Sequence, residues 1–231
     1  IASSIFFLMY KNKEMKMFKF FKEIKEAIQE GIAEANEELA EEKKQEEEQE
    51  KQILSLGNPS VENIAIAFSC PFRDVLTKGT VLRLFNFGML SEDEKESFKS
   101  ILYRDFKIKD AYSVKEALDS ISESVDGEND VHAVFLLAIK IYMITSSVEV
   151  GFISFADYEK CCKEYIRGIV CNDNVYSWES FGKAFMDGEC INNILGRQVL
   201  KSSIRRLLTD KISPWIIFSW EQIQEEVINT F

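Results

Sequence analysis

The sequence predicts an all-α protein, in which a long N-terminal helix precedes a compact globular domain of roughly seven to nine helices. Three observations carry this prediction. The 231-residue chain has only 3 prolines and 10 glycines, so few residues interrupt its long periodic segments. Helix start signals recur along the chain. No stretch alternates between apolar and polar residues with the period of two that marks a half-buried strand.

The composition is typical of a folded, acidic protein. Apolar residues make up 46% of the chain, which is too many for a disordered segment. The formal net charge is -11. Because such a chain repels the phosphate backbone, we expect no nucleic-acid partner. A negative surface suits a basic protein partner instead.

Residues 1–16 form an apolar and then basic leader. Its uncharged run, Ile1 to Tyr10, is shorter than the ~20 residues that span a bilayer. We favour translated upstream sequence, with Met15 or Met17 as the natural start. The end of a longer membrane helix, flanked by the lysines that follow, stays open. So does a signal peptide, although its positive charges would then lie on the wrong side of the apolar run.

An amphipathic and then charged helix is predicted over residues 17–52. Apolar residues recur there at steps of three and four and form one stripe. Lysines and phenylalanines crowd its start, so residues 15–35 would suit a peripheral contact with an anionic membrane. Docking on the chain's own domain or on a second copy is the preferred explanation of the same stripe. Residues 53–60 are the predicted linker to a globular helical domain over 61–231.

Serines mark the helix starts of the globular domain. The predicted N-caps are Ser91, Ser113, Ser154, Ser177 and Ser213. The first two are followed, three residues on, by glutamate, which is the pattern of a capping box. Pro214 then takes a first helical position, where its missing N–H costs nothing. The run VHAVFLLAIKIYMIT (131–145) is apolar nearly all round, which predicts a central buried helix.

The three tryptophans lie in two motifs, YSWESFGKAFMDG (176–188) and SPWIIFSW (213–220). In the first motif Trp178, Phe181 and Phe185 share one helix face, because they are three and four residues apart. Gly188 ends the motif, where a helix C-terminus often needs a positive φ.

Burial is sufficient to explain the tryptophans. Each buried large aromatic side chain removes about 150–250 Å² from water, an upper bound of about 4–6 kcal/mol. We therefore predict that Trp178, Trp215 and Trp220 belong to one continuous core, which joins the helix after Ser177 to the C-terminal segment.

These motifs resemble the bacterial family known as domain of unknown function 1266. The similar pieces are VLRLFNFGML (81–90), GFISFADYEKC (151–161), YSWESFGKAFMDG (176–188) and LLTDKISPWIIFSW (207–220). The similarity extends over residues 60–225. In the family an arginine and an aromatic residue often follow the glycine of the serine-tryptophan helix. Here the chain reads GECINN, so no role of that arginine carries over. The resemblance implies a mostly helical domain and no established activity.

The sequence lacks the residue patterns that disulfide frameworks, metal sites and phosphate-binding loops require. The five cysteines include an adjacent pair, Cys161 and Cys162, and no CxxC, so we expect free, mostly buried thiols in a reducing, cytoplasmic location. The only histidine, His132, begins the most apolar helix and is predicted to be a core or helix-start residue. We expect no metal and no cofactor, since metal-ligand spacings and phosphate-binding loops are missing.

The candidate catalytic residues are carboxylates. Asp187 and Glu189 flank Gly188, and Asp210 precedes the proline-tryptophan step. Paired acids can do acid–base work when one pKa is raised, although acids near helix ends are usually turn or capping residues. The arginines of SSIRR, Arg205 and Arg206, are predicted to pair with these acids.

Two functions follow from these residues. The preferred one is a non-catalytic protein-interaction domain that neutralises or scaffolds a basic protein partner, in the cytoplasm or at the inner face of the membrane. The alternative is a carboxylate-dependent, hydrolase-like enzyme with its site between the two tryptophan motifs.

Overall fold

The computed structural model describes Lys44 and residues 59–76, 90–123, 130–188 and 194–230. The stretches from 59 to 230 belong to one compact unit and contain helices and no strand. The helices are α2 (Val61–Leu76), α3 (Glu92–Phe106), α4 (Ala111–Glu123), α5 (Asp130–Glu149), α6 (Phe155–Val170), α7 (Trp178–Gly188), α8 (Ile194–Leu207), α9 (Pro214–Ile217) and α10 (Trp220–Thr230). The all-α prediction is confirmed for this part of the chain. The predicted leader and, Lys44 apart, the predicted N-terminal helix lie outside the described residues.

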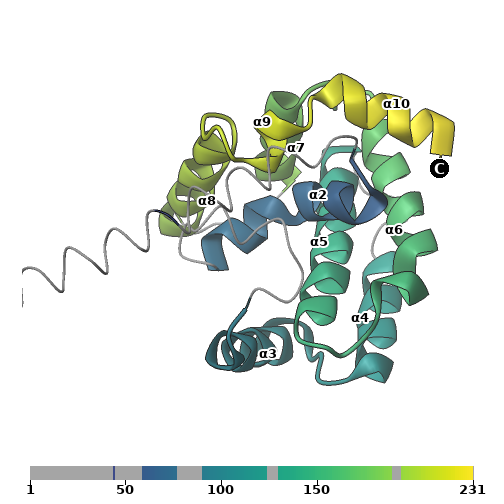
Figure 1. Cartoon of the computed structure of the whole chain (residues 1–231), viewed down its shortest axis with the longest axis vertical. Coiled ribbons are helices and arrows are strands. Elements are labelled where there is room, and N and C mark those ends of the chain that lie inside the picture. The colour runs from purple at the N-terminus through teal and green to yellow at the C-terminus, as the bar shows by residue number, and fades with distance from the viewer. Residues whose placement is uncertain (1–43, 45–58, 77–89, 124–129, 189–193, 231) are drawn as a thin grey trace, which may run out of the picture. The chain divides into compact units, whose positions relative to one another are not determined.

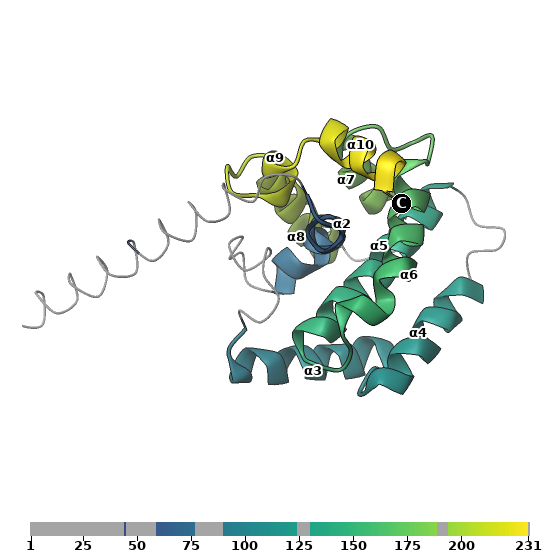
Figure 2. The ribbon, with the colours of Figure 1, turned by 45° about the vertical axis from the view of Figure 1, so that its right-hand side comes forward.

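Helix α5 is the centre of the fold, as its sequence predicts. It contacts α2, α3, α4, α6 and α7. Figures 1 and 2 both place α3 and α4 towards one end of α5, and α9 and α10 towards the other. Among the described helices, only Val131–Glu149 is long and apolar enough to cross a membrane, and 61% of its 18-residue apolar window is buried inside the domain. That burial is typical of a core helix.

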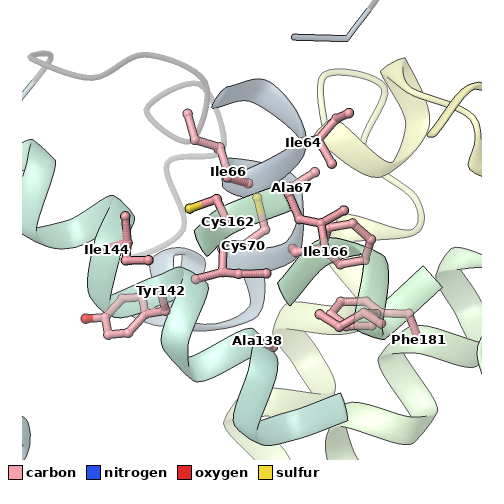
Figure 3. Close-up of a cluster of buried hydrophobic side chains, with 14 of the residues drawn as sticks. Ile64, Ile66, Ala67, Cys70, Ala138, Tyr142, Ile144, Cys162, Ile166 and Phe181 are labelled. Atoms are coloured by element: carbon pink, nitrogen blue, oxygen red, sulfur yellow. The ribbon is translucent and has the colours of Figure 1, made fainter. Parts of the chain in front are cut away.

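The core forms where α2, α5, α6 and α7 meet. Figure 3 shows Ile64 and Ala67 of α2 gathered with Ala138, Cys162 and Phe181 of the other three helices. Each of these five residues is fully buried. Burial of so many apolar side chains is the main force that holds the four helices together.

Burial also decides the state of two thiols. Cys70 and Cys162 are free and buried, and desolvation raises the pKa of both side chains. A thiol with a raised pKa stays protonated and is a poor nucleophile. Cys161 is half-buried and Cys171 is exposed, so the prediction of buried thiols holds for two of the four cysteines described.

Four of the predicted caps are confirmed, and one is wrong. Ser91, Ser154, Ser177 and Ser213 each accept a backbone N–H at the start of a helix, and Ser91 completes a capping box with its glutamate. Ser113 instead lies inside the first turn of α4. Its N–H donates to Asp110 Oδ1 (2.9 Å), and its Oγ accepts from the Asp110 N–H (3.0 Å). Asp110 is the cap, because an aspartate caps as well as a serine and comes three residues earlier.

Gly188 is needed for a different reason from the one predicted. It is the last residue of α7 and has no positive φ. An added Cβ would instead collide with the Val131 carbonyl oxygen and lie 2.8 Å from Phe135 Cβ. The glycine therefore allows α7 to cross α5 closely. At the same crossing His132 Nδ1 lies 2.9 Å from the Gly188 carbonyl oxygen, which confirms His132 as a helix-start residue.

The end of α2 carries two buried charges. Arg73 and Asp74 are both fully buried. Asp74 forms an ion pair with Arg206 of α8, and Arg73 Nη2 lies 3.6 Å from Glu149 Oε2 of α5. Arg206, predicted to pair with the acids of the tryptophan motifs, thus pairs with a residue 132 positions away. These contacts fix α2 against α5 and α8.

We predict that Gly188→Ala destabilises the domain by about 1–3 kcal/mol, the usual range for overpacking. The backbone carbonyl of Val131 cannot turn away from the new methyl group. Unfolding in urea measures the loss. Gly168→Ala is the matched control, because its Cβ would meet only the end of the Leu137 side chain. Equal stability of the two variants would contradict the proposed close crossing.

Candidate functional site

The two tryptophan motifs meet in one aromatic cluster. The rings of Trp178 and Trp215 stack with centroids 5.1 Å apart and an interplanar angle of 5°. Trp220 stands edge-on to Trp178 at 5.1 Å. All three residues are at most 5% exposed and belong to the main core, as predicted. Stacked and edge-on arrangements are those that aromatic quadrupoles favour.

The cluster continues into α2 and α7. Phe68 lies 5.1 Å from Trp178 and 5.0 Å from Phe181 between ring centroids. Phe181 and Phe185 follow one another along the inner face of α7, with centroids 6.0 Å apart. Phe185 in turn meets Phe72 at 5.0 Å. Aromatic side chains therefore fill the space between the two motifs.

A proline in α2 explains where Trp215 binds. Pro71 lies inside the helix and has no N–H, so the carbonyl of Ala67, four residues earlier, lacks its usual helical donor. Trp215 Nε1 donates to that carbonyl at 2.8 Å. The indole thus satisfies a buried acceptor that the proline leaves free. Trp215 follows Pro214, the first residue of α9, and its backbone N–H donates to the Ser213 cap.

Trp178 makes the second indole hydrogen bond of the cluster. Its Nε1 donates to the Phe218 carbonyl at 2.8 Å, which ties α7 to the segment between α9 and α10. Trp220 Nε1 finds no acceptor in the part of the chain that the structure describes. Its ring stands edge-on to Phe68 as well as to Trp178. The three indole rings therefore pack inside the core of the domain.

The two candidate carboxylates that the structure describes, Asp187 and Asp210, do not line the same pocket. Asp187 is exposed on the outer face of α7. Asp210 lies in the turn before α9, where Oδ1 accepts the Ile212 N–H at 3.3 Å, as a turn residue does. Glu189 lies outside the described residues. Asp187 lines an open pocket, and Asp210 is not among the residues around it.

That pocket lies between α7 and α8 and has a volume of about 810 Å³. Its charged lining consists of Asp173 in the turn before α7, Glu179, Lys183 and Asp187 of α7, and Lys201 and Arg205 of α8. Sequence reasoning missed the two lysines. The sequence nevertheless indicates both rows of charge, because the charged residues repeat every four positions on α7 and on α8. On α7 this row lies on the face opposite the aromatic side chains.

The charged side chains of the pocket are not neutralised by one another. Within the described stretches, none of the six makes an ion pair or a side-chain hydrogen bond, and all six are exposed. The site therefore offers both signs of charge to a ligand. No group of histidine, cysteine and acidic residues among the described residues could hold a metal ion.

Comparisons of the chain with protein-family models, curated proteins and solved structures find no match. The resemblance to domain of unknown function 1266 therefore stays a prediction.

We predict that Ser177→Ala costs about 1 kcal/mol of stability, the usual value of an N-cap. Ser177 Oγ accepts the Ser180 N–H at 3.1 Å, and no other side chain replaces it at that amide. Chemical unfolding measures the change. Ser202→Ala is the control, because this exposed serine bonds only to a carbonyl of its own helix. A Ser177 variant as stable as the Ser202 variant would contradict the cap.

We predict that Trp215→Phe costs less in a Pro71→Ala background than in the natural chain. In the natural chain the substitution leaves the Ala67 carbonyl buried and unpaired. The restored amide at position 71 can take over that carbonyl. A double-mutant cycle should give a coupling of about 1 kcal/mol, the size of one hydrogen bond.

Trp178→Phe is the control for this cycle, because Trp178 donates to Phe218 and not to Ala67. Its cost should be the same with either residue at position 71. Additive costs for the Trp215 and Pro71 substitutions would show that the proline and the tryptophan act independently.

Proposed function

We propose that the globular domain is a non-catalytic protein-interaction domain that scaffolds or neutralises a basic protein partner. One observation carries this proposal. The stacked rings of Trp178 and Trp215 fill the space between the two motifs, where the enzyme alternative has its site. The motifs then contribute stability, and the exposed charges remain for binding.

Helix α10 supports a basic partner. It carries Glu221, Glu225 and Glu226 and no basic residue, and among the described residues these acids have no ion pair. The acids of α3 differ, since Lys95 and Lys99 pair with Glu92 and Glu96 at 2.7 Å. Unpaired carboxylates steer a cationic partner and add specificity. Ile228, which is 78% exposed, adds an apolar contact at the end of α10.

The test is a purification of the tagged full chain from its native cells, followed by a binding measurement with the basic protein recovered. We expect binding that weakens with added salt. Replacing all three glutamates of α10 with glutamine should weaken it by at least about tenfold, since close charge pairs across interfaces carry more than about 1.4 kcal/mol.

The matched control replaces Glu92 and Glu96 of α3 with glutamine. These acids are already paired within their own helix, so binding should not change. Recovery of no basic protein, or equal loss of binding in both variants, would contradict the proposal.

The enzyme alternative keeps one supporting observation. Asp187 lines an open pocket beside Lys201 and Arg205, where a carboxylate could act on a bound substrate. Chromogenic esters, amides, phosphates and glycosides test it. Turnover that is lost in Asp187→Asn and kept in Asp210→Asn would favour the enzyme. Absence of turnover with every substrate class would favour the interaction domain.

The cytoplasmic location and the membrane contact of residues 15–35 belong to the same proposal. They rest on the reducing environment that free thiols require and on the lysine-rich start of the chain.

A further inference from the structure

The pocket between α7 and α8 has the size of a small-molecule site. Its volume of about 810 Å³ falls within the range of ~300–1,000 Å³ that is usual for ligand pockets. Part of its lining is apolar, from Ala184 and Met186 of α7, Ile204 of α8 and Leu208 after it. A ligand there would bury an apolar portion against these side chains.

The charges around this apolar lining are arranged by helix. The charged residues that α8 contributes, Lys201 and Arg205, are both cationic and lie one turn apart. Helix α7 contributes two acids, Glu179 and Asp187, with Lys183 between them, and a third acid, Asp173, lies in the turn before α7. A guanidinium and an ammonium side by side favour a carboxylate, which an arginine can bind through two parallel hydrogen bonds. The acids of α7 favour an ammonium group.

The frame of the pocket is preorganised. Gly182 of α7 has no side chain, and a Cβ there would lie 2.8 Å from Ile204 Cγ2, so the two helices pack directly. Ser177 and Ser180 cap the start of α7 reciprocally, with N···Oγ distances of 2.8 and 3.1 Å. The aromatic cluster holds the inner face of the same helix. A rigid frame lowers the entropy that binding costs.

We propose that this pocket binds a small zwitterionic ligand of the amino-acid type, with one carboxylate, one ammonium group and an apolar chain. The carboxylate binds Arg205 and Lys201, the ammonium binds the acids of α7, and the chain covers the apolar lining. Exposed charges of both signs in the pocket distinguish this ligand from a simple anion or cation. The inference goes beyond the proposed protein interaction and does not depend on it, since α10 contributes no residue to the pocket.

Calorimetric titration of the full chain tests the proposal with four probes. L-leucine and 6-aminohexanoate carry both charges, whereas hexanoate and hexylamine carry one each. We expect saturable binding of at least one zwitterion at millimolar concentrations or below. Hexanoate and hexylamine should bind at least about tenfold more weakly, because each lacks one charge-assisted hydrogen bond.

Matched variants assign the site. Arg205→Gln should weaken binding of the zwitterion by at least about tenfold, and Asp187→Asn or Glu179→Gln should do the same for the ammonium end. The controls are Arg197→Gln, an exposed arginine of α8 away from the pocket, and Asp210→Asn. Both should bind as the natural chain does. The variants at Glu179, Asp187, Arg197 and Arg205 should keep its melting temperature, since these side chains are exposed.

Three outcomes would overturn the proposal. The first is that neither zwitterion binds at millimolar concentrations. The second is that hexanoate or hexylamine binds as tightly as the zwitterions, which would indicate a site for one charge only. The third is that Arg197→Gln weakens binding as much as Arg205→Gln does, which would place the binding elsewhere. None of these outcomes bears on the basic partner of α10.

Discussion

The hydrogen bond from Trp215 to the Ala67 carbonyl is the interaction on which the arrangement of the C-terminal half depends. Pro71 leaves that carbonyl without a donor inside a buried helix, and an unpaired buried acceptor costs about 1–3 kcal/mol. The indole removes this cost and so fixes α9 on α2. Trp178 then stacks on Trp215 and donates to the Phe218 carbonyl, which fixes α7 and the start of α10 in turn. The missing hydrogen bond at Pro71 of α2 thus determines how α9, α7 and the start of α10 pack.

Helix α7 joins this core to the outer surface. Its inner face carries Trp178, Phe181 and Phe185, and its outer face carries the charged side chains of the pocket. Because the inner face is buried in the core and Gly182 packs directly against Ile204, the outer face of α7 is held at a fixed distance from α8. The aromatic core therefore stabilises the domain and also keeps the charged side chains on the outer face of α7 in a constant arrangement.

Local features of the fold could be predicted from the sequence, and contacts between distant residues could not. Four serine caps are correct because a cap is made within four residues. Ser113 was misassigned because Asp110 competes for the same role over the same short range. Gly188 was singled out correctly, but its reason is a close contact with Val131, which no local pattern reveals. The bond between Trp215 and Ala67 joins residues 148 positions apart. Of the candidate site, the charges of α7 and those of α8 were each readable from their spacing of four residues, whereas the fact that the two helices face one another across a pocket needed the structure.

Two buried charges, Arg73 and Asp74, lie in the last turn of α2 and also join this helix to distant parts of the chain. Arg73 is fully buried, and its nearest carboxylate oxygen is 3.6 Å away, too far for a hydrogen bond, so the attraction to Glu149 is electrostatic alone. Such a pair adds little net stability, because desolvation of both charges offsets their attraction. Removing either partner would still be costly, since the other charge would stay buried. The Arg73–Glu149 pair joins α2 to α5, and the Asp74–Arg206 pair joins α2 to α8. Since α8 forms one wall of the pocket, the charges inside α2 help to position the charges that a ligand would meet.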